Sequence, residues 1–190
     1  MINLILFNMK NLFLYKYNVL LTYTPRKETN LEKYEKWLID VDNPFFNSIN
    51  EVSHYSNWKV LNRLDNFDFE YFDFLTFNTL SDFNITWHSE KVKKFTSEWR
   101  RLWGQAPKSK NLHLNARVFL LENLSDKPLE FQNFVGLNFI KKALKLNNYN
   151  FRLVRSIRDE ADFECVKIEF TYDRSQISSE IIGKLIVGPS

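Results

Sequence analysis

The chain has 190 residues, of which 44% are hydrophobic, and its formal net charge is +3. Lys and Arg number 26 against 23 Asp and Glu, a balance unlike the clustered basic excess of nucleic-acid-binding proteins. With 4 glycines, and neither a GxGxxG nor a GxxxxGKS pattern, the sequence predicts no phosphate-binding loop.

The single cysteine, Cys165, cannot form an intramolecular disulfide or a CxxC metal pair. This fits a reducing compartment, so we predict a cytoplasmic protein with no metal site and no cofactor. Residues 1–17 are apolar but lack the basic region and cleavage site of a signal peptide. They are too short and too polar to span a membrane, so we treat them as an N-terminal extension and expect no membrane contact.

The first predicted elements are a strand and a helix. Residues 18–25 are typical of a strand that ends at Pro25. Thr29 and Glu32 have the spacing of a capping box, and apolar residues then recur on one helical face. Pro44 is predicted to end this helix, because the residue before a proline avoids the helical region.

Two strands and a second helix follow. Strands are predicted at 51–63 and 69–79, the latter aromatic on both faces and therefore buried on both sides or lining a cavity on one. A helix capped by Ser81 or Asp82 is predicted to reach Trp103 or Gly104. Its basic residues between Lys91 and Arg101 are interpreted as a solvated face.

After a linker at 105–111 the same order of elements begins again. We predict a strand, a helix, two strands and a short helix, at 112–122, 125–144, 151–158, 163–172 and 175–185. The order β-α-β-β-α thus occurs twice, at 18–104 and 112–190. The predicted fold class is α+β, with two ferredoxin-like βαββα repeats forming one single-chain barrel of the dimeric α+β-barrel type.

The segments YEKWLIDVDNPFFNSINEVSHYSNWKV, YFDFLTF and WHSEKVKKFTSEW resemble the RedY-like proteins of prodiginine pigment pathways. The resemblance covers about residues 18–103. It depends on Trp37, Asp42 and Pro44 in a first helix and its turn, and on the segments Ser48–Val52, Tyr71–Phe77 and Ser89–Val92. The chain departs from the pattern in having Asn before the proline, and in carrying a second, diverged repeat where the family forms a dimer.

This resemblance implies a small-molecule-binding protein of secondary metabolism. The first hypothesis is an enzyme that catalyses a cofactor-free cyclisation or condensation of an aromatic or polyketide-like intermediate. The alternative is a non-catalytic accessory protein of such a pathway, so whether the chain is an enzyme stays open. The oligomer would be a homodimer or a single-chain pseudo-dimer. A nucleic-acid-binding sheet is not predicted, because no RNP-like run occurs.

His54 and Asp73 are the candidate catalytic residues. His54 shares a strand face with Trp58, and a histidine near its ordinary pKa can act as an acid or a base. Asp73 lies inside the aromatic run EYFDFL, where a carboxyl must be paired, solvated in a cavity or raised in pKa. The alternatives are a half-buried histidine bonded to backbone and a structural hydrogen bond of the aspartate.

The expected substrate-binding residues are aromatic or lie next to one: Tyr23, Trp58, Tyr71, Trp87 and His88. Trp87 and His88 lie near the start of the second helix, and the alternative for His88 is an exposed first-turn position. Asp42, at the end of the first helix, is interpreted as a capping or site residue or as part of a solvated loop. Cys165 is predicted to be a small buried residue.

Overall fold

The computed structural model describes residues 13–63, 68–104, 116–125, 129–142, 149–158 and 161–188. The predicted linker at 105–111 lies outside these ranges, and so do residues 1–12 of the predicted N-terminal extension. The described helices are α1 (Leu31–Trp37), a π-helical turn (Leu38–Asp42), α2 (Asn43–Asn47), α3 (Leu80–His88), α4 (Glu90–Leu102) and a 3-10 turn (Arg174–Gln176). None of them is long and apolar enough to cross a membrane.

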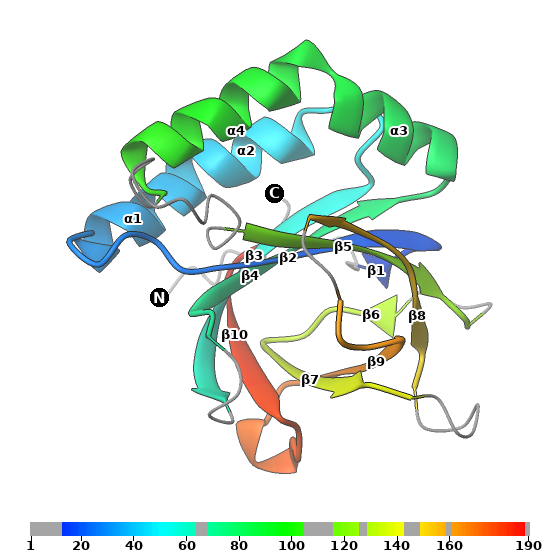
Figure 1. Ribbon diagram of the computed structural model, residues 1–190. Helices are drawn as coiled ribbons and strands as arrows, with labels where there is room; N and C mark the ends of the chain where they lie inside the picture. The colour runs from blue at the N-terminus through cyan, green and yellow to red at the C-terminus, as the bar shows by residue number, and fades with distance from the viewer. Residues whose placement is uncertain are drawn as a thin grey trace, which may run out of the picture.

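The strands form a closed antiparallel barrel of eight strands within the one chain (Figure 1). Its order around the wall is β10-β3-β4-β2-β5-β8-β9-β7, and β7 pairs with β10 to close it. The bounds are β2 (Tyr17–Tyr23), β3 (His54–Arg63), β4 (Tyr71–Phe77), β5 (Ala116–Asn123), β7 (Phe134–Ile140), β8 (Phe151–Arg158), β9 (Cys165–Thr171) and β10 (Ile181–Val187). Two short strands, β1 (Phe13–Leu14) and β6 (Leu129–Glu130), pair separately. The predicted α+β class and single-chain barrel are confirmed.

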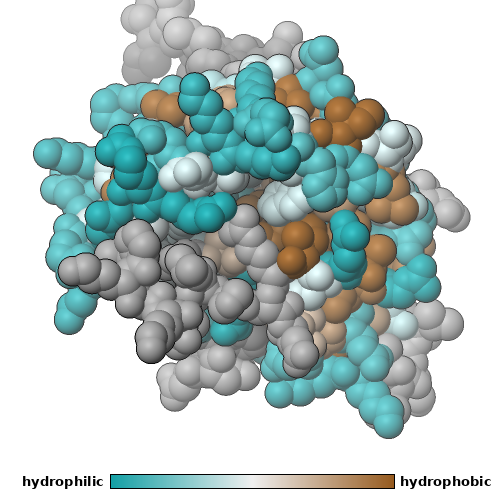
Figure 2. Space-filling view, turned by 45° about the horizontal axis from the view of Figure 1, so that its top comes forward, coloured by the Kyte–Doolittle hydropathy of each residue, from teal (hydrophilic) through white to brown (hydrophobic). Residues whose placement is uncertain are grey.

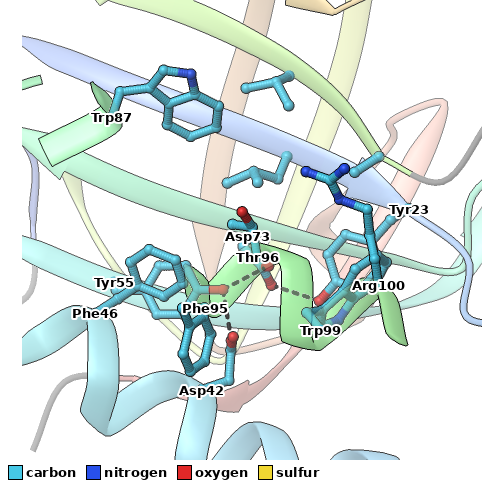
Figure 3. A pocket seen from close by; sticks show the side chains of 13 residues that line it. Tyr23, Asp42, Phe46, Tyr55, Asp73, Trp87, Phe95, Thr96, Trp99 and Arg100 are labelled. Carbon is cyan, nitrogen blue, oxygen red and sulfur yellow. Dashed lines mark hydrogen bonds between the residues drawn. The ribbon is translucent and has the colours of Figure 1, made fainter. Parts of the chain in front are cut away.

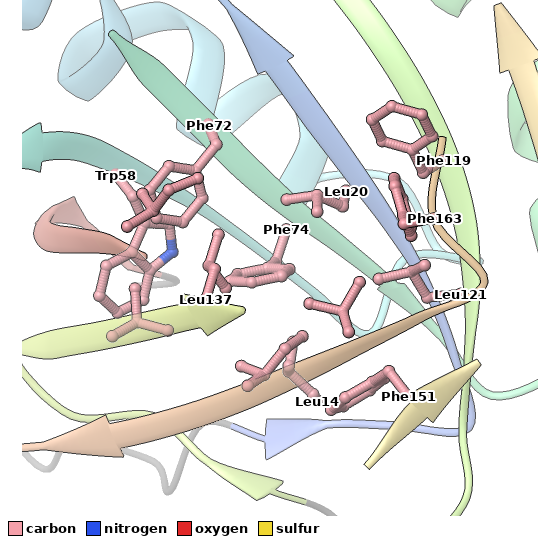
Figure 4. Close-up of a cluster of buried hydrophobic side chains, with 14 of the residues drawn as sticks. Leu14, Leu20, Trp58, Phe72, Phe74, Phe119, Leu121, Leu137, Phe151 and Phe163 are labelled. Atoms are coloured by element: carbon pink, nitrogen blue, oxygen red, sulfur yellow. The ribbon is translucent and has the colours of Figure 1, made fainter. Parts of the chain in front are cut away.

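Side chains alternate across the barrel wall along β3 and β4. Trp58, Phe72 and Phe74 point inward and form the barrel core together with residues from β5, β7 and β9 (Figure 4). Their neighbours on the same strands point outward, where α1 to α4 lie over β2 to β5 (Figure 1). All seven residues of β4 are therefore buried, as predicted for a strand that is buried on both sides or lines a cavity on one.

The second half contains no α-helix within the described residues, so the helices expected at 125–144 and 175–185 are wrong. The first segment contains β6 and β7, and the second contains the end of the 3-10 turn and β10. Short apolar runs fit helix and strand periods equally well. Pairing with neighbouring strands decides for a strand, because β7 pairs with β9 and β10, and β10 pairs with β3 as well.

The predicted second helix consists of two helices. Thr79, not Ser81 or Asp82, caps α3, and its side chain forms a capping box with that of Asp82. Ser89 then ends α3 and caps α4 with its own side chain. The basic residues of α4 are exposed, as predicted, and hydrophilic side chains cover much of this helix layer (Figure 2).

Candidate functional site

A cavity of about 340 Å³ lies between the helix layer and the outer face of the barrel wall (Figure 3). Most of its surface is apolar, and a few polar groups lie among the aromatic rings. It is lined by residues of the wall and of the covering helices: Leu21, Tyr23, Tyr55, Asp73, Ala116 and Val118 from the strands, and Asp42, Phe46, Trp87, Phe95, Thr96, Trp99 and Arg100 from the helical layer. This size and composition are typical of a small-molecule site.

Two buried carboxyl groups lie at one end of this cavity, and Tyr55 lies between them. The Tyr55 hydroxyl oxygen is 2.7 Å from Oδ2 of Asp42 and 2.8 Å from Oδ2 of Asp73 (Figure 3). Tyr23 donates its hydroxyl to Oδ1 of Asp73 at 3.0 Å. Asp42 and Asp73 are 4% and 3% exposed, so the protein and not bulk water supplies most of their partners.

Asparagine side chains complete this network. Nδ2 of Asn57 lies 2.9 Å from Oδ2 of Asp42 and 2.9 Å from Oδ1 of Asp73, so the amide donates to both carboxyls. Asn43 donates to Oδ1 of Asn57 at 3.1 Å, which fixes the orientation of the Asn57 amide. Asn47 donates to Oδ1 of Asn43 at 2.9 Å, so a chain of oriented amides leads to the acid pair.

The geometry favours one proton shared by the pair. The Tyr55 hydroxyl has one hydrogen and therefore donates to one of the two carboxyls. The second short contact is a hydrogen bond when the other carboxyl is protonated and donates its own hydrogen to the Tyr55 oxygen. Burial raises the pKa of Asp42 to about 6. Burial, and then the charge of Asp42, raise the pKa of Asp73 well above its usual range. Within the described residues no Lys, Arg or His forms an ion pair with either group.

A π-helical turn brings Asp42 to this position. The backbone N–H of Asn43 donates to the carbonyl of Leu38, five residues earlier, and Pro44 follows in the first turn of α2. The prediction that Pro44 ends the helix is therefore wrong. Proline has no N–H to donate, and a first turn requires none, so the helical path continues. The widened turn directs Asp42 toward the sheet, and such turns are frequent at functional sites.

Strand register brings the other groups together. Asp73 lies directly opposite Asn57 on β3 and Leu21 on β2. Tyr55 and Tyr23 lie two residues away along these strands, on the same outer face. The network is therefore a property of three neighbouring strands and one helical turn.

The structure places three of the predicted site residues, Asp73, Tyr23 and Trp87, in the cavity wall. Trp87 also stacks on Phe83, with ring centroids 6.0 Å apart. Tyr71 lies on the same outer face but donates to Glu35 at 2.9 Å and does not line the cavity. The catalytic and binding roles assigned to these residues stay predictions.

Trp58 and His54 lie on the other side of the barrel wall from Asp73, so they do not share a cavity with it. Both belong to the strand face opposite to that of Tyr55, so they lie on the inner side of the wall while Asp73 lies on the outer side. Trp58 is fully buried in the barrel core. The His54 ring lies 5.4 Å from that of Tyr15. His88 is the exposed last residue of α3, not a first-turn residue.

Four residues of the network were not among the site residues predicted from the sequence: Tyr55, Asn57, Asn43 and Asn47. The alternation of β3 already grouped Tyr55 with Asn57, and pairing with Asp73 would have identified their face. For Asp42 the sequence allows a capping residue, a site residue or a residue of a solvated loop. Cys165 is buried, as predicted, and no cluster of three potential metal ligands occurs among the described residues.

The raised acid pKa values predict a characteristic pH dependence of stability. When the pKa of an acid is higher in the folded than in the unfolded protein, the acid contributes stability at pH values below the pKa that it has in the unfolded protein. This contribution is lost as the pH rises through the pKa that the acid has in the folded protein. The pKa of Asp42 rises from 3.8 to about 6. Relative to an Asp42→Asn variant, we expect wild type to lose roughly 3 kcal/mol of unfolding free energy from about pH 4 to pH 7.

Denaturant unfolding at a series of pH values measures this difference. Asp40→Asn is the matched control, because Asp40 is two residues away but pairs with Lys36 on the surface. The control is expected to follow wild type at every pH. An Asp42→Asn curve that runs parallel to that of wild type would contradict the raised pKa of Asp42.

Comparison with known protein families supports the resemblance seen in the sequence. A family model described as "HapK: REDY-like protein HapK" matches residues 18–109. The comparisons with curated proteins and with solved structures found no match. The matched range contains β2 to α4, and thus the acid pair and all cavity residues except Ala116 and Val118. Over residues 18–109, the chain is therefore similar to the REDY-like HapK proteins.

Proposed function

We propose that the chain is a small-molecule-binding protein of secondary metabolism that catalyses a cofactor-free cyclisation or condensation in the cytoplasm. The observation that carries the proposal is a buried, proton-sharing acid pair at the end of an aromatic cavity. The similarity to REDY-like proteins supports the assignment to secondary metabolism. The closed barrel within one chain supports a single-chain pseudo-dimer over a homodimer.

The aromatic walls supply binding and orientation. Phe46, Phe95, Trp87 and Trp99 present ring surfaces to the cavity. They favour a flat aromatic or polyketide-like molecule, whose apolar area leaves water when it enters. Holding such a molecule in a reactive shape accelerates an intramolecular closure or the joining of two bound parts.

The acid pair supplies proton transfer. A carboxyl with a pKa near neutrality can donate a proton to a carbonyl oxygen and later accept one from carbon or nitrogen. In this proposal Asp42 exchanges the proton with the substrate. Asp73, which is hydrogen-bonded to Tyr23, Tyr55 and Asn57, acts as its electrostatic partner. His54 has no part in this mechanism, because it lies on the other face of β3.

The second candidate function is a non-catalytic accessory protein that binds the same class of molecule. The same cavity supports it, because aromatic walls suffice for binding without chemistry. The two candidates differ in whether the acid pair is required for product formation, and the corresponding experiment opens the Discussion.

Filling the cavity is expected to abolish ligand binding under either function. Thr96 on α4 lines the cavity, and Thr96→Trp would place a large ring in its space. Lys94→Trp is the matched control, because Lys94 is exposed on the same helix. Native mass spectrometry of protein purified from the producing cells is expected to show a co-purified small molecule in wild type and control. It should be absent from Thr96→Trp. Retention of the molecule by Thr96→Trp would place it elsewhere on the protein.

A further inference from the structure

One oxygen of the acid pair, Oδ1 of Asp42, has no hydrogen-bond partner among the described residues. Every hydrogen bond of the Asp42 side chain with a described residue involves Oδ2, which is bonded to the Tyr55 hydroxyl and the Asn57 amide. Oδ1 accepts no hydrogen bond from a described residue. It also keeps some accessible surface, because it is not one of the fully buried side-chain atoms that lack a hydrogen-bond partner. Because Asp42 is 4% exposed and lines the cavity, this oxygen is available to a molecule inside the cavity and to little else.

The charge of the site is also uncompensated. With one shared proton, Asp42 and Asp73 together carry about one negative charge, and a buried charge without a partner is costly. Within the described part of the chain no cationic side chain forms an ion pair with either carboxyl. The cation of the cavity lining is Arg100, which is exposed, so solvent screens it from the buried end.

The aromatic lining of the same cavity suits a flat cation. Phe46 contacts Phe95 edge to face, with ring centroids 5.5 Å apart, and Trp87 and Trp99 also line the cavity. Aromatic faces attract a delocalised cation through their quadrupole, most strongly where water is excluded. A phenol would also donate to Oδ1 but would bring no charge, and a carboxylate would meet two acceptors of its own sign.

We propose that the cavity selects a planar nitrogen-containing aromatic molecule whose protonated N–H group donates to Oδ1 of Asp42. This inference rests on the proposed small-molecule site and adds the chemical class of the ligand. The ring lies among Phe46, Phe95 and Trp87, and the nitrogen replaces the missing donor at the acid pair. A charge-assisted bond of this kind is stronger than a neutral one, so the nitrogen group decides selectivity.

Three bicyclic probes of similar size test the proposal: 2-aminoquinoline, 2-naphthol and 2-naphthoate. Calorimetric titration of the full chain near neutral pH is expected to show 2-aminoquinoline binding about tenfold or more tightly than the other two. Asp42→Asn should remove this preference, and Asp40→Asn should retain it. The ranking on wild type requires no variant, so the test stands even if Asp42→Asn folds poorly.

The other outcomes separate this inference from the proposed function. Equal affinity for the three probes, or a preference unchanged in Asp42→Asn, would overturn the nitrogen selectivity but leave the small-molecule cavity in place. Tightest binding of 2-naphthoate would overturn it in favour of an anion held by Arg100. No binding of any probe, together with full product formation by Thr96→Trp, would overturn both the ligand class and the proposed function.

Discussion

Replacing Asp42 and Asp73 together with asparagine is expected to lower formation of the pathway product by about 10²- to 10⁴-fold, the usual contribution of a positioned acid or base. Asparagine keeps the size of each side chain and hydrogen-bonding atoms at both positions, but it cannot take up or release a proton near neutrality. Because Tyr55 and Asn57 still find partners, the cavity should keep its shape. The expected loss is therefore one of chemistry and not of folding.

The measurement begins with a metabolite that is present in extracts of the parent cells and absent when the gene is deleted. Its amount is then compared in cells that carry the double variant or Asp40→Asn, which alters a surface carboxylate in the same helical segment. Asp40→Asn is expected to match wild type. Product formation by the double variant at the wild-type level would refute acid–base catalysis and favour the accessory function. A strain lacking the gene that makes every metabolite of the parent would refute both.

Replacing Trp58 with alanine is expected to lower the free energy of unfolding by about 3–5 kcal/mol, the usual cost of deleting a large buried aromatic ring. The ring is fully buried and is surrounded by Phe72, Phe74, Phe131 and Phe170, with centroids 5.5 to 6.3 Å away. Its indole N–H donates to Ser56 at 2.9 Å, so alanine would also remove a buried hydrogen bond.

Denaturant unfolding of Trp58→Ala and Trp58→Phe provides the measurement, the latter for the case in which alanine prevents folding. Trp58→Phe should lose less, because phenylalanine fills most of the space. Trp87→Ala is the control, since Trp87 is half-buried at the cavity and should affect ligand binding more than stability. Near-wild-type stability of Trp58→Ala with impaired ligand binding would restore the original prediction that Trp58 is a binding residue.

The types of the elements in the first half were predictable from local patterns, but the helix boundaries at Pro44, Thr79 and Ser89 were not. The alternation at 18–25 and 51–63 and the helical spacing between them correspond to β2, β3 and α1. The second half was less predictable. FVGLNFI and IIGKLIV are short apolar runs that suit helix and strand alike, and they become β7 and β10 because each completes the barrel wall.

The candidate site was predictable in one respect. A carboxyl in the run YFDFLTF has to be paired or to line a cavity, because an isolated buried charge is too costly, and the structure shows Asp73 doing both. The partners were not predictable in the same way. Tyr55 and Asn57 resemble ordinary strand residues, and Asp42 resembles an ordinary residue at a helix end.

The sequence by itself determined that the chain is α+β, that β4 is buried on both faces or lines a cavity on one, and that Asp73 must be paired, solvated in a cavity or raised in pKa. Only the tertiary structure decided which face of β3 and β4 is inside the barrel, because both faces carry aromatic residues and periodicity cannot rank them. Closure of the wall by β10 places Trp58 in the core and Tyr55 at the cavity. The π-helical turn before Pro44 then brings Oδ2 of Asp42 to 2.7 Å from the Tyr55 hydroxyl oxygen. The two residues are thirteen positions apart in the chain, so packing of the helix on the sheet sets this distance, and no local motif does.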